Sequence, residues 1–375
     1  MMIGRLTFLY MYVCLCIILF NVAFNLHTKI QPRALYHKKK VLKDLLTHEI
    51  YRQDETKRQV LKTHLIKRLK NIDYLKAFHE TLVDIEATKL SIDWILIGEV
   101  ISDLSYFYRD KKAEKKAYFA YLVYFFDLNH KIETNTCSLK EARARLSRIL
   151  MTFLWEDSIY ARNNAFKAVM SLGIEEDALK ALKIMDKRTG QHNGKLIQNH
   201  LLNFTGNHQK LADSLYDDLE AFTWSIQAAV INYLRMVPAE YVSHEAYWEG
   251  LYKLLCDENQ HKEVRLALIR YFKKYYYLPV QETLIEYVQS KEEEKWEFAV
   301  VAAMALESYE GNEKDEALTE ALSSSNWYIR LNAAESLINK GYSYEQLMQS
   351  GLDKYACDML TYRRQLRDMK ERRAI

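Results

Sequence analysis

The feature that most constrains the fold of this chain is an eleven-residue pattern that recurs in its second half. Trp296–Leu306 (WEFAVVAAMAL) and Trp327–Leu337 (WYIRLNAAESL) align without a gap, and their starts are 31 residues apart. Similar segments begin at Trp224 and Lys262, so the four starts are separated by 38, 34 and 31 residues, and an earlier copy is predicted at 159–169. Spacings of this size are typical of chains built by stacking one structural repeat.

The residue types within the pattern predict a helix that packs closely against other helices. Apolar residues recur every three or four positions, as at Ile329, Ala333 and Leu337, which is the spacing of one helix face. Adjacent alanines such as Ala333 and Ala334 carry little bulk, so neighbouring helices can approach each other closely there. Because the stretch at 315–324 also reads as a helix, each copy is predicted to be the second helix of a pair. One pair cannot bury its apolar face without stacked neighbours.

The composition favours an all-α fold. The 375 residues include only 10 Gly and 3 Pro, so the turn-rich pattern of an all-β chain is missing. The formal net charge of +3 is too small to indicate a nucleic-acid-binding protein by itself. The five cysteines show neither a disulfide pairing pattern nor a metal-ligand spacing.

Residues 155–342 resemble the HEAT repeats of the armadillo-type superhelix. The last copy carries the resemblance most closely, through Asn326, Trp327, Tyr328, Ile329, Arg330, Asn332, Ala333, Ala334, Leu337 and Gly341. The resemblance implies an α-α superhelix, or HEAT-like solenoid, in which Arg162, Arg265 and Arg330 hold the arginine position of the second helix. Gln227 and Ala299 depart from that pattern. HEAT motifs specify a fold and a mode of assembly rather than a reaction.

The N-terminal segment is predicted to form one transmembrane helix. Leu6–Leu26 are apolar except for Thr7, Asn21 and Asn25, and such a helix would span about 31 Å, close to the thickness of the hydrocarbon layer. The run is long and bulky and lacks a good cleavage site, which favours a retained anchor over a cleaved signal peptide. The residues assigned to this anchor are Leu6, Phe8, Leu9, Val13, Leu15, Ile17, Ile18, Leu19 and Phe20.

Basic residues after the apolar run indicate the orientation of the chain. Residues 29–43 contain six Lys or Arg residues, whereas the other side of the run has Arg5, so the positive-inside rule places the body in the cytoplasm. Residues 29–75 carry 13 Lys or Arg against 5 Asp or Glu. We expect this segment to attract anionic lipid headgroups through Lys38, Lys39 and Lys40. A compatible alternative is that these charges are the solvated face of a helix whose apolar stripe lies at 41–46.

The chain is divided into five predicted segments. They are an N-terminal transmembrane anchor at 1–28, a basic juxtamembrane helical segment at 29–75, a helical N-terminal part of the solenoid at 76–154, HEAT-like repeats at 155–342 and a C-terminal capping helix at 343–375. The aromatic run at 117–128 is too short to span a bilayer. It is predicted to be a buried core helix, with a second membrane-contacting surface or a partner groove as the alternative.

No motif in the sequence indicates an enzyme or a cofactor. The phosphate-binding, dinucleotide-binding, metalloprotease and nucleophile-elbow patterns are all missing. His192, His200 and His208 are spaced by eight residues, which does not bring them to one turn of a helix. The alternative is an enzyme or nucleic-acid-binding protein on the same fold. That alternative requires a basic, aromatic groove, and the only such patch in the repeats is at 273–277.

The sequence therefore predicts a single-pass membrane protein whose helical repeats bind another protein at the cytoplasmic membrane. The chain resembles membrane-anchored HEAT-repeat proteins of bacterial type. The architecture alone suggests an accessory role in a bacterial envelope or polysaccharide assembly. Tryptophan, tyrosine and arginine dominate binding hot spots, so the predicted partner-binding residues lie at the starts of the second helices. They are Trp224, Trp296, Trp327, Tyr328 and Arg330. The alternative is that this column of residues packs repeat against repeat. The sequence leaves the partner and the oligomeric state open.

Overall fold

The structure is a computed structural model that describes residues 2–47, 54–88, 90, 92–126, 137–188 and 193–374. Within these ranges, the side chains of 2–9, 21–33, 137–139, 367–368 and 371–374 are left out of the description. Every regular element of the described residues is a helix, which confirms the predicted all-α class. The chain divides into two compact units, Met1–Leu172 and Gly173–Ile375, and each is described by itself.

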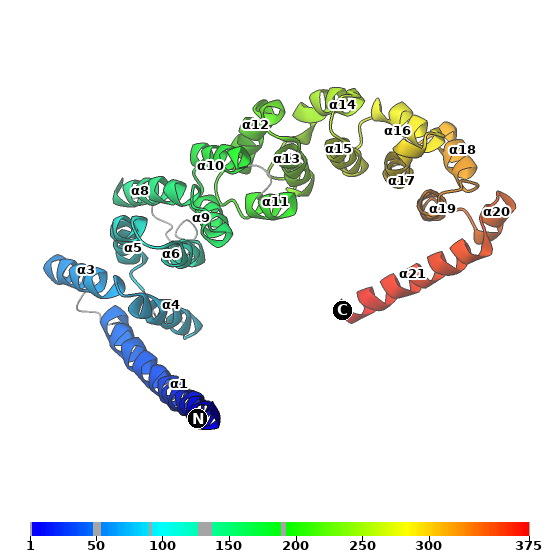
Figure 1. Cartoon of the computed structure of the whole chain (residues 1–375). Helices are drawn as coiled ribbons and strands as arrows, with labels where there is room; N and C mark the ends of the chain where they lie inside the picture. The colour runs from blue at the N-terminus through cyan, green and yellow to red at the C-terminus, as the bar shows by residue number, and fades with distance from the viewer. Residues whose placement is uncertain are drawn as a thin grey trace. The chain divides into compact units, whose positions relative to one another are not determined.

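The first unit consists of helices that pack side by side. The described helices are α1 (Met2–Thr47), α3 (Glu55–Leu69), α4 (Ile72–Ala87), α5 (Trp94–Arg109), α6 (Ala113–Phe126), α8 (Cys137–Phe153) and α9 (Ile159–Ser171). Helix α5 packs on α3 and α8, whereas α6 packs on α9 (Figure 1). The aromatic helix α6 buries Phe119, Leu122, Val123 and Phe126, which confirms that it is a core helix.

Helix α1 is continuous across the predicted boundary between residues 28 and 29. Its C-terminal part packs on α4, where Leu42 and Leu46 are buried. Lys39 Nζ lies 3.3 Å from Glu80 and 2.8 Å from Asp84. The hydrogen bond to Asp84 raises the pKa of Lys39. Two of the three predicted lipid-binding lysines are therefore engaged within the chain, because Lys38 also lies 3.6 Å from Asp73.

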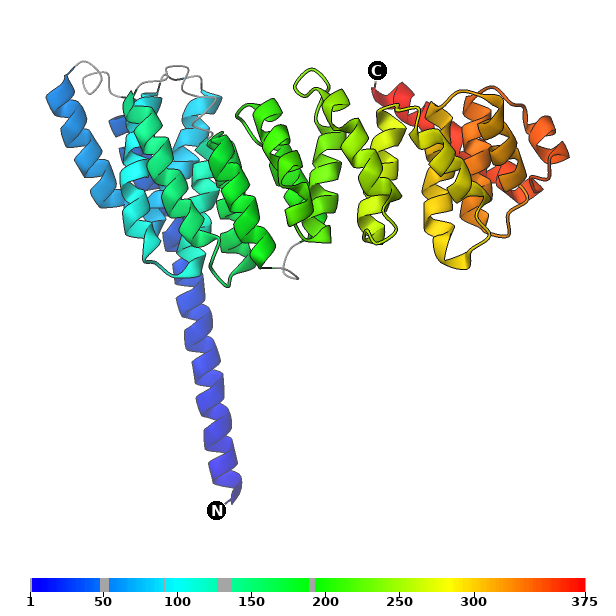
Figure 2. The same ribbon diagram turned by 90° about the horizontal axis from the view of Figure 1, so that it is seen from above.

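The predicted membrane anchor is described only in part. The side chains of Leu6, Phe8 and Leu9 lie outside the described residues, whereas Val13, Leu15 and 17–20 are described and are 46–71% exposed. Figure 2 shows the N-terminal half of α1 projecting beyond the other helices of the first unit. Over the part of the chain that the structure describes, no helix is both long enough and apolar enough to cross a membrane.

The second unit is a stack of helix pairs in two layers. Its longer described helices are α10 (Glu175–Lys187), α11 (Gly194–Leu202), α12 (His208–Asp217), α13 (Trp224–Met236), α14 (Trp248–Cys256), α15 (Lys262–Lys274), α16 (Val280–Gln289), α17 (Trp296–Ala305), α18 (Asn312–Ala321), α19 (Trp327–Asn339) and α21 (Lys354–Ala374). The second helices α11, α13, α15, α17 and α19 each pack on the next. In the first layer, α10 packs on α12 and α16 packs on α18 (Figure 1).

The repeat pattern of the sequence matches the helices of the second unit. Trp224, Lys262, Trp296 and Trp327 are the first residues of α13, α15, α17 and α19, respectively. The alanines at 302–303 and 333–334 are fully buried where α17 and α19 pack together. These close contacts confirm the role predicted for the small residues.

Gly341 explains where the last second helix ends. Its φ of 102° is in the left-handed region, which other residues rarely adopt. The amide of Gly341 donates to Ile338 at 2.9 Å, and the amide of Tyr342 donates to Leu337 at 3.1 Å. This pair of bonds is the Schellman arrangement that closes a helix. The predicted capping segment follows as two helices, α20 (Tyr344–Gln349) and α21.

An aromatic cluster fills the core near the C-terminal ends of α13 and α15. His244 is 4% exposed, and its ring stacks on Tyr275 with 3.8 Å between centroids. The hydroxyl of Tyr271 lies 3.3 Å from His244 Nδ1. Burial, together with the positive charge of Lys274, lowers the pKa of His244 to about 4. The folded state therefore favours neutral His244.

Replacing Ala334 with phenylalanine is expected to destabilise the second unit by about 1–3 kcal/mol, because the site has no space for a large side chain. Thermal or urea unfolding of the purified chain measures the change. The control is Ala239→Phe, since Ala239 lies on an exposed turn. Equal stability of the Ala334→Phe and Ala239→Phe variants would show that α19 does not pack closely through this alanine.

Acidification is expected to destabilise the second unit through His244. Its pKa in the folded state lies below the usual value near 6.5, so the unfolded state takes up a proton more readily as the pH falls. The stability due to neutral His244 is complete above about pH 6.5 and is lost toward pH 4. We expect a loss of about 2 kcal/mol between about pH 7.5 and pH 5. Urea unfolding should show this loss in the natural chain and a smaller one in His244→Phe. Equal losses in both chains would contradict the assignment.

Candidate protein-binding edge of the second unit

Aromatic residues stand at the N-terminal ends of the second helices and remain exposed to solvent. Trp224 is 48% exposed, Trp296 41% and Tyr328 58%. Trp327 is half-buried. Asn326 fixes the start of α19, because its side chain accepts hydrogen bonds from the amides of Tyr328 and Ile329. The turns and caps of the repeats thus place these rings at one end of the second-helix layer.

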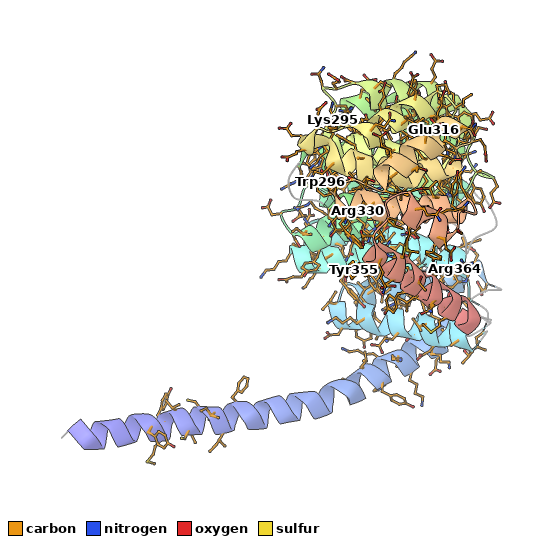
Figure 3. The ribbon with its side chains drawn as sticks, turned by 90° about the vertical axis from the view of Figure 1, so that its right-hand side faces the viewer. Lys295, Trp296, Glu316, Arg330, Tyr355 and Arg364 are labelled. Atoms are coloured by element: carbon orange, nitrogen blue, oxygen red, sulfur yellow. The ribbon has the colours of Figure 1, made fainter. Side chains whose placement is uncertain are left out.

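The exposed rings bridge neighbouring helices along this end. Trp224 stacks on His261, with ring centroids 4.1 Å apart. The centroids of Trp296 and Tyr328 are 6.5 Å apart, and those of Trp327 and Tyr355 are 5.1 Å apart. We call this surface the aromatic edge, which consists of Trp224, His261, Trp296, Trp327, Tyr328 and Tyr355. Figure 3 shows Trp296, Arg330 and Tyr355 following one another, with Glu316 on another side of the unit.

Arg330 stabilises the turn before α19. Its Nη1 atom donates to the carbonyl oxygens of Ser324 at 2.6 Å and Ser325 at 3.2 Å. Its Nε atom lies 3.3 Å from a carboxylate oxygen of Asp353, in the turn before α21. The guanidinium also lies 5.6 Å from the centroid of Trp327. Arg330 therefore positions the edge through its own turn and an ion pair with the next turn.

The same interaction recurs in other repeats. In the first unit, Arg162 is 1% exposed and donates to the carbonyl oxygens of Glu156 and Asp157 at 2.7 and 2.8 Å. Gln227 departs from the arginine pattern, yet its side-chain amide donates to Phe222 at 3.0 Å. Arg265 is different, because its Nη2 atom donates to the hydroxyl of Tyr287 at 2.6 Å. Arg162 and Gln227 therefore both donate to carbonyl oxygens of the segment before their own helix.

Sequence reasoning missed the role of an asparagine two residues after this position. Asn332 donates from its side chain to the carbonyl oxygen of Val300 at 2.8 Å, which links α19 to α17. Asn164 donates to Ala117 at 3.0 Å and links α9 to α6. Both asparagines are the sixth residue of their helices, counted from Trp327 and Ile159. An asparagine at the same position of both helices was the sequence signal that could have indicated this role.

The surroundings of the edge carry charges of both signs. Exposed carboxylates lie in the turns at 257–258 and 292–294. Lys262 lies 2.5 Å from Glu297, and Lys295 lies 2.7 Å from Glu292. A groove of about 650 Å³ next to these turns is lined by Cys256, Glu258, Arg265, Thr283, Glu286, Tyr287, Gln289, Ser290, Lys291, Glu292 and Lys295.

The patch at 273–277 does not provide a set of free cations. Lys273 lies 3.0 Å from Glu307, and Lys274 donates to the carbonyl oxygen of Arg235 at 2.7 Å. Two of the three histidines singled out in the sequence lie within the fold. His208 Nδ1 lies 2.9 Å from the hydroxyl of Tyr233, and His200 is buried. His192 lies outside the described residues. Among the residues that are described, no group of three potential ligands could hold a metal ion.

Comparison with known proteins provides no family assignment. No protein-family model matches the chain, and no curated protein matches it. An engineered protein of known crystal structure is 16% identical over 87% of this chain and 94% of its own chain, with a TM-score of 0.32. That score is too low to define a common fold.

Replacing Arg330 with alanine is expected to destabilise the last repeat by about 1.5–3 kcal/mol, because the turn carbonyl oxygens lose a charged donor. Arg330→Gln should cost less, since Gln227 bonds a turn carbonyl at the matching position. Urea unfolding of both variants measures the difference. If glutamine is as harmful as alanine, the side chain stabilises the fold through the ion pair with Asp353 rather than through the turn.

Proposed function

We propose that this protein is a membrane-anchored scaffold of the HEAT-repeat type, which binds a protein partner through the aromatic edge. The observation that carries the proposal is the exposure of large aromatic side chains along one row. Trp296 and Tyr328 come from successive second helices, and both present more than 40% of their surface to water. Tryptophan and tyrosine at such positions are typical of binding hot spots.

The HEAT assignment is supported by the repeated local interactions. Arg162 and Arg330 each bond two carbonyl oxygens of the turn before their own helix. Asn332 donates to a carbonyl oxygen of α17, and Asn164 donates to one of α6, the helix on which α9 packs. Identical side chains therefore perform identical tasks 168 positions apart, counted from 164 to 332, as expected for copies of one repeat.

The anchor is proposed from the apolar run at 6–26 and from the exposure of its described residues. Phe20, for example, is 71% exposed, and a continuous row of such side chains is unfavourable in water. The contacts of Leu42 and Lys39 with α4 would couple an anchored α1 to the first unit. The excess of Lys and Arg after Leu26 places the repeats in the cytoplasm in this proposal.

Alanine variants of the full chain test the proposed edge. We expect Trp296→Ala and Tyr328→Ala to weaken partner binding by about 2 kcal/mol or more each. Affinity capture from detergent-solubilised membranes, followed by titration with the recovered protein, measures the change. Tyr241→Ala is the matched control, because Tyr241 is 54% exposed and lies outside the edge. Thermal melting of the same variants separates lost binding from lost folding.

The proposed edge is wrong if each variant that loses the partner also melts early. The anchor has a separate test, which is the fractionation of cells that produce the full chain. We expect the protein to remain with membranes after alkaline carbonate extraction, whereas a variant lacking residues 2–28 is released. Release of both chains would contradict the anchor without affecting the edge.

A further inference from the structure

The last helix of the chain carries an apolar seam that the second unit leaves largely exposed. Tyr355, Tyr362 and Met369 of α21 are 64%, 56% and 50% exposed, respectively. Met359 and Leu366 lie between them and are partly exposed. We call these five residues the α21 seam. Their spacings are four, three, four and three residues, which is the heptad pattern of a helix that packs along another helix.

Apart from Tyr355, whose ring centroid lies 5.1 Å from that of Trp327, the seam lies on a different side of α21 from the residues that are buried against the unit. With about 100° of rotation per residue, the five seam positions fall within about 80° of one another. Ala356, Cys357 and Leu360 are buried, and they point about 145° away on average. Among the described helices, α21 packs mainly on α19 (Figure 1). A second helix can therefore reach the seam without displacing α19.

One pair of opposite charges beside the seam is self-complementary. Heptad positions d are 355, 362 and 369, and positions a are 359 and 366. Asp358 then occupies position g, while Arg363 and Lys370 occupy the e positions on the opposite flank. In a parallel pair of helices, position g faces position e of the partner in the next heptad. Asp358 of one copy would therefore face Arg363 of the other.

The orientation follows from the same charges. In an antiparallel pair, e faces e, so the basic flanks would repel each other. Arg363 already lies 3.1 Å from Glu335 of α19, so Asp358 of the other copy would join an existing ion pair. Figure 3 labels Tyr355 at the beginning of α21 and Arg364 farther along the helix. Arg364 occupies position f, away from the seam.

We propose that the α21 seam binds the α21 seam of a second copy of this chain, in a parallel and in-register coiled coil. The contact goes beyond the proposed scaffold function and does not depend on it. It covers about two heptads, so the dimer is weak and depends on protein concentration. Because Tyr355 belongs to both the seam and the aromatic edge, dimerisation brings two copies of that edge together.

Cysteine cross-linking of the full chain in detergent tests the proposal. In a parallel in-register pair, the two copies of position 362 face each other, so Tyr362→Cys should form a disulfide-linked dimer under mild oxidation. Arg364→Cys is the matched control, since it is exposed and only two residues away. The unsubstituted chain sets the background from the native cysteines. Equal cross-linking at 362 and 364, or none at 362, would overturn the proposal.

Sedimentation of full-length variants provides a second readout. Leu366→Glu should raise the dimer dissociation constant by more than about tenfold, because it buries an unpaired charge in the seam. Asp358→Lys should raise it by roughly twofold to fivefold, because lysine would face Arg363 of the other copy. Unchanged circular dichroism must accompany both effects. A chain that stays monomeric at all soluble concentrations overturns the proposal. The proposal is also overturned if these variants lose binding to anionic vesicles or to an acidic helical peptide while their dimerisation is unchanged.

Discussion

Close packing between successive second helices is the interaction on which the second unit depends. The fully buried alanines of α17 and α19 allow the two backbones to approach, and larger side chains would separate them. The inner second helices α13, α15 and α17 are each packed on a second helix on both sides. An isolated helix pair would leave these apolar faces open to water. The layer of second helices thus provides the rigid base from which the turns and their side chains are presented.

The turns are held by a small set of hydrogen bonds, and these bonds decide which side chains are left for binding. Arg330 is committed to the carbonyl oxygens of Ser324 and Ser325 and to Asp353. The ring centroids of Trp296 and Tyr328 lie 6.5 Å apart, and both side chains remain exposed to solvent. Of the residues selected from the sequence, Arg330 therefore acts mainly in positioning and Trp327 is half-buried, whereas Trp224, Trp296 and Tyr328 form the exposed surface.

Local periodicity allowed the second helices to be predicted. Contacts between residues that are far apart in the sequence could not be predicted in this way. The starts at Trp224 and Trp327 follow from residue spacing. Gly341 belongs to the repeat pattern, and the structure shows that it ends the last second helix. By contrast, Lys39 meets Glu80 and Asp84 only because α1 packs on α4. Nothing local in the sequence specifies that contact. The candidate edge was predicted as a column of residues, while the contributions of His261 and Tyr355 appear only when neighbouring turns are brought together.

The central claim is that the aromatic edge is a solvent-facing surface that a partner covers in the cell membrane. Hydroxyl-radical footprinting with mass spectrometry tests it directly, on the purified chain and on the chain in its native membranes. In the purified chain, Trp296 and Tyr328 should be oxidised rapidly, whereas the buried Tyr271 and Tyr309 are protected. In native membranes, Trp296 and Tyr328 should become protected while Tyr241 stays reactive. Equal oxidation of Trp296 and Tyr328 in both preparations would contradict the account.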